Sequence, residues 1–123
     1  MADCCASAGS NIMLLACSGG SNVGQLSNRA AVELTQEGFG KMFCLAGVGG
    51  GISGFVQSAK DAPVVVAIDG CPIGCAKKIL ENNGIEHAKY VVLTEIGIEK
   101  NKNLDPVTAE LEMVKKAIRE TCA

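Results

Sequence analysis

Two cysteines, Cys71 and Cys75, lie one helical turn apart in the segment Asp69–Cys75, directly behind a strand-like apolar run. A helical pattern follows, which predicts that Cys71 is the N-cap, that Pro72 is the first helical residue, and that Cys75 lies on the same face. The unpaired N–H groups and the positive end of the dipole at a helix start stabilise negative charge. Because thiolates bind soft metal ions and attack electrophiles, the segment indicates metal binding or thiol chemistry.

Two more cysteines stand near the ends of other strand-like segments. Cys17 opens a glycine-rich turn, and Cys44 lies near the end of a second apolar segment. Four converging thiolates, from Cys17, Cys44, Cys71 and Cys75, would match a tetrahedral thiolate site. Cysteine is also one of the most frequently buried residue types. Cys44 therefore fits a core position as well as it fits a ligand, and Cys122, on the apolar stripe of the last helix, fits packing.

The elements that must position these thiols alternate along the chain. Apolar or β-branched segments bounded by Gly, Ser, Pro or Asp predict four buried strands, at residues 12–16, 41–45, 63–68 and 89–94. Helical patterns occupy residues 23–37, 55–60, 75–82 and 106–118. The alternation predicts one three-layer α/β domain over residues 11–123, with a four-stranded, mainly parallel sheet and helices on both faces. We expect a Rossmann-like or flavodoxin-like arrangement with the strand order 2-1-3-4.

Several helix ends carry recognisable signals. Asn22 and Gln25 resemble a capping box for the first long helix, and Gly38 can end it. Asp105 is the expected N-cap of the last helix, with Pro106 at its first position.

The carboxyl ends of parallel strands lie along one edge of a sheet, where ligands bind at the topological switch point. This rule places the four cysteines at the same edge, together with Glu95 as a possible oxygen ligand or base. His87 precedes the last strand at the opposite edge and is expected to be structural. Residues 1–10 are expected to form a flexible lead-in, in which Cys4 and Cys5 are either free thiols or additional ligands.

Composition excludes several classes of function. The 123 residues are 48% hydrophobic and 3% aromatic, and their net charge is -2. A nucleic acid or an anionic membrane surface would require clustered Lys and Arg, which the chain lacks. Its longest apolar runs are far shorter than the roughly 20 residues of a membrane helix. Seven cysteines, an odd count without a recognisable signal peptide, favour the reducing cytoplasm over a secreted disulfide scaffold.

Two other sites compete with the metal hypothesis. Residues 49–54 satisfy the G-x-G-x-x-G pattern, with Asp69 about 20 residues further on. The run follows the second strand rather than the first, however, and the chain lacks a second half for a dinucleotide. The segment Cys17–Val23 is similar to the phosphate-binding loop of low-molecular-weight tyrosine phosphatases and arsenate reductases. Val23 replaces the arginine that clamps the anion in those enzymes, which disfavours oxyanion chemistry of that kind.

Several blocks of the sequence, in one order, resemble the DGC-domain family, which is named for its Asp-Gly-Cys triplet and regarded as zinc-binding. The blocks cover nearly the whole chain and comprise residues 16–25, 40–47, 68–72 with Cys75, 93–97, and 99–100. The resemblance implies that Cys17, Cys44, Cys71 and Cys75 bind zinc, with Cys4 or Cys5 as further participants.

These observations lead to one principal hypothesis and one alternative. The principal hypothesis is a small cytoplasmic α/β protein whose partner is a metal ion, zinc, held by cysteine thiolates at the carboxyl edge of the sheet in a binding, carrier or sensing role. The alternative is a thiol redox or sulfur-transfer enzyme in which Cys71 or Cys75 attacks and a neighbouring thiol resolves. A closed site with four thiolates favours the first, and an open position or a reactive thiol favours the second.

Overall fold

Four parallel strands form the central sheet. The structure is a computed structural model that describes residues 11–122, and its strands are β2 (Ile12–Ala16), β3 (Lys41–Met42), β4 (Val64–Asp69) and β5 (Lys89–Val92). They pair in the order β3-β2-β4-β5, with Ile12 opposite Val64 and Asp69 opposite Val92. The predicted order 2-1-3-4 is therefore confirmed. The expected lead-in, residues 1–10, lies outside the described residues.

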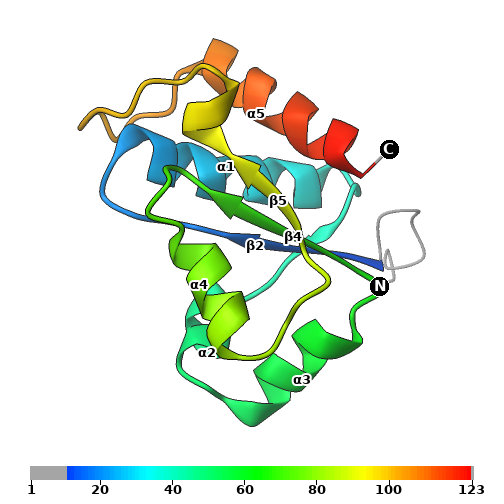
Figure 1. The fold of residues 1–123 in the computed structure, drawn as a ribbon. Helices are drawn as coiled ribbons and strands as arrows, with labels where there is room; N and C mark the ends of the chain where they lie inside the picture. The colour runs from blue at the N-terminus through cyan, green and yellow to red at the C-terminus, as the bar shows by residue number, and fades with distance from the viewer. Residues whose placement is uncertain (1–10, 123) are drawn as a thin grey trace.

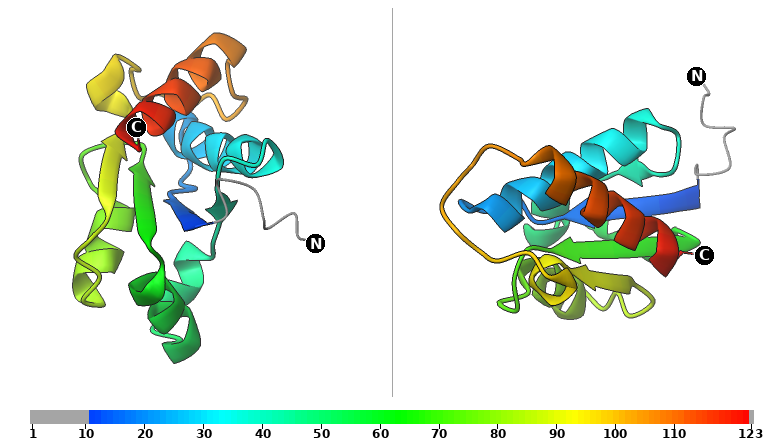
Figure 2. Two further views of the ribbon diagram at one scale, coloured as in Figure 1. Left: turned by 90° about the vertical axis from the view of Figure 1, so that its right-hand side faces the viewer. Right: turned by 90° about the horizontal axis from the view of Figure 1, so that it is seen from above.

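Helices cover both faces of the sheet (Figure 1). Helices α1 (Asn22–Gln36) and α5 (Thr108–Thr121) lie on one face, and α2 (Leu45–Gly49), α3 (Ser53–Asp61) and α4 (Cys75–Asn82) lie on the other. Strand side chains alternate between the faces, so that Leu14 and Val66 pack with α1 and α5, whereas Leu15 and Val65 pack with the remaining helices. Seen from above, α1 and α5 lie next to each other over the strands (Figure 2). No helix within residues 11–122 is both long and apolar enough to cross a membrane.

The second strand is shorter than the sequence predicts. β3 ends at Met42, and Cys44 is the N-cap of α2, so the prediction that Cys44 lies inside a strand is wrong. The chain leaves the sheet early because β3 is an exposed edge strand. Its last hydrogen bond to β2 runs from the Phe43 N–H to the Leu14 carbonyl, at 2.9 Å. The G-x-G-x-x-G run spans the end of α2 and the start of α3 instead of a strand-to-helix turn. It therefore lacks the setting of a dinucleotide fingerprint.

Two helix starts differ from the predicted ones. Ser21 rather than Asn22 caps α1, and the Ser21 Oγ accepts a hydrogen bond from the Gly24 N–H at 3.1 Å. Asp105 lies outside α5, because its N–H donates to Asn103 Oδ1 at 3.1 Å and the helix begins only at Thr108. Side-chain turns in the preceding polar loop thus delay α5.

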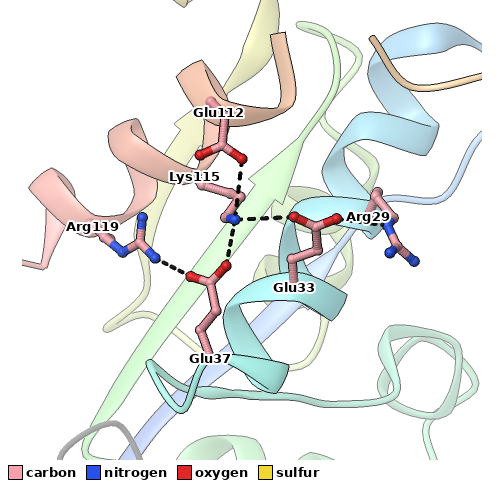
Figure 3. Close-up of polar contacts among 6 residues, drawn as sticks. All are labelled: Arg29, Glu33, Glu37, Glu112, Lys115 and Arg119. Carbon is pink, nitrogen blue, oxygen red and sulfur yellow. Dashed lines mark hydrogen bonds and ion pairs between the residues drawn. The ribbon is translucent and has the colours of Figure 1, made fainter. Parts of the chain in front are cut away.

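A buried lysine fastens α5 to α1 (Figure 3). The Lys115 side chain is 6% exposed, and its ammonium lies 3.1 Å from Glu33, 2.5 Å from Glu37 and 3.4 Å from Glu112. The hydrogen bonds to Glu37 and Glu33 raise the pKa of Lys115. The same contacts lower the pKa of Glu33 and of Glu37, which also pairs with Arg119. The buried charge is therefore compensated from both helices.

The amino edge of the sheet holds the single histidine of the sequence. His87 Nε2 lies 2.9 Å from the carbonyl oxygen of Ala62, just ahead of β4. This position at the edge opposite to the strand ends fits the structural role expected for His87.

Candidate thiol site at the carboxyl edge of the sheet

The segment after β4 is built around a buried aspartate. Asp69, 1% exposed, accepts hydrogen bonds from the N–H groups of Ala76 at 2.8 Å and Lys77 at 3.0 Å, and from the hydroxyl of Tyr90 at 2.7 Å. Burial, followed by the bond to Asp69, raises the pKa of Tyr90. The carboxylate satisfies orphan amides at the amino end of α4, where negative charge is favoured. Asp69 of the Asp-Gly-Cys triplet is thus a structural anchor for this helix.

Helix α4 starts later than the sequence predicts. α4 begins at Cys75 with Gly74 as N-cap at φ +72°, so Cys71 is not the N-cap and Pro72 is not the first helical residue. Residues 71–74 form a turn in which the Gly74 N–H donates to the Cys71 carbonyl at 3.2 Å. The helix starts later than predicted because Asp69, reaching from the strand end, takes over the capping.

Two glycines allow the loops after β2 and β4 to approach the first turn of α1. A Cβ on Gly70 would lie 2.8 Å from Val23 and 2.9 Å from the Gly24 nitrogen. A Cβ on Gly24 would lie 2.5 Å from the carbonyl oxygen of Gly19. No side chain fits at either position without backbone movement. The two loops therefore flank the start of α1, where the connections change from one face of the sheet to the other.

Two half-buried thiols follow neighbouring strands at this edge. Cys17 comes directly after β2, and its Sγ accepts a hydrogen bond from the Gly19 N–H at 3.4 Å. Cys71 follows β4 and packs against the core under α1 and α5. The ammonium of Lys100 donates to Cys71 Sγ at 3.5 Å. Because β2 and β4 are adjacent and parallel, both thiols lie at the same edge of the sheet.

The other two predicted ligands are exposed. Cys75 is the first residue of α4, and Cys44 precedes α2, the helix that packs beside α4. Glu95 is exposed on the 3-10 helix η2 (Leu93–Ile96), which replaces the predicted end of the last strand. Cys122 is half-buried at the end of α5 against the core, and burial raises its pKa. The position of Cys122 fits the packing role predicted for it.

The donor chemistry suits a soft divalent ion, but the described side chains do not gather around one point. The four predicted ligands are free thiols, the donor type that zinc accepts in closed sites. Within residues 11–122, no three Cys, His, Asp or Glu side chains are grouped closely enough to hold a metal ion. Cys4 and Cys5 lie outside the described residues. A metal centre at this edge therefore requires movement of thiol-bearing side chains, or a donor from outside this range.

Asn22 and Lys100 have roles that no sequence pattern predicted. Asn22, 4% exposed, donates from Nδ2 to the Glu99 carbonyl at 2.8 Å and accepts the Asn101 N–H at 2.6 Å. The Asn22 N–H also donates to the Asn101 carbonyl at 3.0 Å. This clamp fixes the chain on both sides of Lys100. Glu99 and Asn101 follow Asn22 by 77 and 79 residues, so local spacing carries no signal for the clamp. The one signal was that both Asn22 and Lys100 fall in the blocks that resemble the family.

Comparison with known proteins identifies the family of this chain. The sequence pattern of the DGC domain matches residues 13–118. A curated relative from Pseudomonas aeruginosa, described as "Anaerobic and virulence modulator AnvM", is 37% identical over 93 residues, which cover 76% of this chain and 71% of the relative. No solved structure matches the chain. The resemblance seen in the Asp-Gly-Cys segment and its companion blocks is therefore one of kinship, and the chain belongs to the DGC-domain family.

Proposed function

We propose that this protein binds a thiophilic metal ion, zinc, through the thiolates of Cys17, Cys44, Cys71 and Cys75. The observation that carries the proposal is that these free thiols follow strands β2, β3 and β4, whose carboxyl ends share one edge of the sheet. Ligands of parallel α/β sheets bind at that edge. Thiolates alone suffice to complete a tetrahedral zinc site.

A binding, carrier or sensing role suits this arrangement better than a structural metal. The two apolar clusters that flank the sheet are complete without any metal ligand at their centres. Because the described thiols are not grouped in advance, metal binding has to draw their loops together. Such a change couples metal occupancy to the conformation of the loops, which is what a sensor requires. The description of the Pseudomonas relative as a modulator supports a regulatory role, and the free thiols suit the reducing cytoplasm.

The test is a metal and thiol count on protein purified without oxygen. We expect zinc in elemental analysis, and we expect chelator alone, without reductant, to expose at least two of Cys17, Cys44, Cys71 and Cys75 to alkylation. Zinc affinity should fall as pH is lowered, because protons compete for the same sulfur lone pairs. If a reductant rather than a chelator is needed to release the thiols, the metal proposal fails.

Serine variants separate the site from the fold. Cys71→Ser and Cys75→Ser should each weaken zinc binding strongly while circular dichroism stays that of the wild type, because neither residue is a fully buried core residue. Cys122→Ser is the matched control, since Cys122 lies at the end of α5 and away from the strand ends. Equal loss of zinc in all three variants would count against the assignment.

A second candidate function is thiol redox or sulfur-transfer chemistry. The contact that favours it is the Lys100 ammonium on Cys71 Sγ at 3.5 Å, with the exposed Cys75 at the start of α4 as a resolving thiol. A cation beside sulfur is the environment of reactive cysteines. Loss of two free thiols on mild oxidation, and their return with dithiothreitol in metal-free protein, would favour this function over zinc binding.

A further inference from the structure

The ammonium of Lys100 lies beside the thiol site, and the backbone that carries it is fixed by hydrogen bonds. Lys100 is exposed, yet its ammonium lies 3.5 Å from Cys71 Sγ and donates to it. Lys102, two residues further along the same loop, is also exposed, and it makes no hydrogen bond to a cysteine within residues 11–122. Lys100, unlike Lys102, lies between two residues that Asn22 bonds, Glu99 and Asn101.

The buried Asn22 fixes that backbone. Its side chain bonds the Glu99 carbonyl on one side of Lys100 and the Asn101 N–H on the other, at 2.8 Å and 2.6 Å. The Asn22 N–H adds a third bond, to the Asn101 carbonyl at 3.0 Å. Because Asn22 is the first residue of α1, the loop that carries Lys100 is fastened to the same helix start that the Cys17 and Cys71 loops flank.

We propose that Lys100 is the charge-compensating residue of the thiolate metal site, positioned by Asn22 and acting through Cys71. This inference rests on the proposed function. Zinc with four thiolates carries two net negative charges, in a chain whose own net charge is already -2. An ammonium that donates to a ligand sulfur offsets part of this charge and orients the ligand. Removal of such an outer partner typically costs about 10- to 100-fold in metal affinity.

The test compares metal binding by the full chain and three lysine variants. Zinc and cobalt affinities are measured for wild type, Lys100→Met, Lys100→Arg and the matched control Lys102→Met by competition with a chromophoric chelator. We expect Lys100→Met to bind about tenfold more weakly, because an exposed ammonium acts at the low end of the range for outer partners. Lys100→Arg should retain most of the affinity, and Lys102→Met should match wild type.

A spectroscopic signature distinguishes this role from a merely structural one. The thiolate-to-cobalt charge-transfer band should shift in Lys100→Met, because a ligand sulfur loses its hydrogen bond, and it should not shift in Lys102→Met. Urea unfolding of the metal-free variants should be unchanged, since Lys100 is exposed. Unchanged affinity and band position in Lys100→Met, or an equal change in Lys102→Met, would overturn the inference and leave the proposed function standing. If no variant, wild type included, binds either metal, the proposed function itself is overturned, and the role of Lys100 falls with it.

Discussion

The buried Asp69 should contribute more to the free energy of unfolding than any exposed carboxylate of this chain. Asp69→Asn tests this, because it changes the charge and one hydrogen-bonding atom while keeping the shape of the side chain. The asparagine oxygen can still accept from the Ala76 N–H, but the amide nitrogen replaces the oxygen that accepts from both Lys77 and Tyr90. The Lys77 N–H then faces the side-chain NH₂ group of the new asparagine, which is also a donor. The substitution therefore removes a charge-assisted bond and also leaves an amide at the start of α4 without a partner.

The magnitude follows from these contacts. A hydrogen bond to a charged group contributes about 1.5–3 kcal/mol, and loss of a helix cap costs about 1 kcal/mol. Because the two figures describe partly the same contact, we expect Asp69→Asn to lower the free energy of unfolding by about 2–3 kcal/mol. Tyr90→Phe leaves the carboxylate with its two amide partners and should cost about 1.5 kcal/mol, the low end of that range, because Tyr90 is only half-buried.

Urea unfolding followed by circular dichroism measures these losses. The double variant should lose about 1 kcal/mol less than the sum of the single variants, because the tyrosine bond is already weakened when Asp69 is changed. Asp105→Asn, at an exposed position outside any helix, is the control and should stay within about 0.5 kcal/mol of wild type. An Asp69→Asn protein as stable as that control would refute the anchoring role of Asp69.

The remaining predictions concern the close approach to α1 and the ion cluster between α1 and α5. Gly70→Ala should lower the free energy of unfolding by about 1–3 kcal/mol in thermal scans, because its Cβ would press on the α1 backbone. Gly54→Ala is the control: its Cβ would enter open space beside α3, so it should be neutral or stabilising by up to about 1 kcal/mol. Equal melting temperatures for the two variants would contradict this expectation. Lys115 lowers the folded-state pKa of Glu33 and Glu37, so their stabilising contribution is present above the ordinary value of 4.5 and is lost as pH falls below it. The urea midpoint should therefore fall with acid below that pH in wild type and fall less steeply in Lys115→Met, and an identical acid slope in both proteins would argue against the pairing.

The sheet was predictable because its signals are local. Short apolar runs bounded by Gly and Pro predict the strands, and their alternation with helical stripes predicts parallel order and a shared carboxyl edge. The length of β3 was not predictable in the same way. Phe43 and Leu45 continue the apolar pattern of residues 41–42, but the chain turns into α2 at Cys44 because an edge strand has a partner on one side only.

The placement of Cys17 and Cys71 at the carboxyl edge of the sheet was predictable, and the contacts that support this edge were not. Cys17 and Cys71 were singled out because a cysteine at the end of a predicted strand can be recognised from the local sequence alone. The capping of α4 by Asp69 was missed, because local rules place the cap next to the helix, whereas this carboxylate reaches over seven residues to Ala76. Lys100 was missed because its position depends on Asn22, far away in sequence.

The fastening of α1 at both ends to the last part of the chain has a consequence during protein synthesis. Asn22 bonds Asn101, 79 residues later, and Glu33 pairs with Lys115, 82 residues later. At ribosomal rates of roughly 5–20 residues per second, α1 emerges about 4–16 seconds before either partner. In the last part of that interval, after its own synthesis, the Cys71 thiol has no Lys100 ammonium beside it. Until the residues around Lys100 are made and Asn22 binds them, a nascent chain therefore carries the Cys71 thiol without its cationic partner.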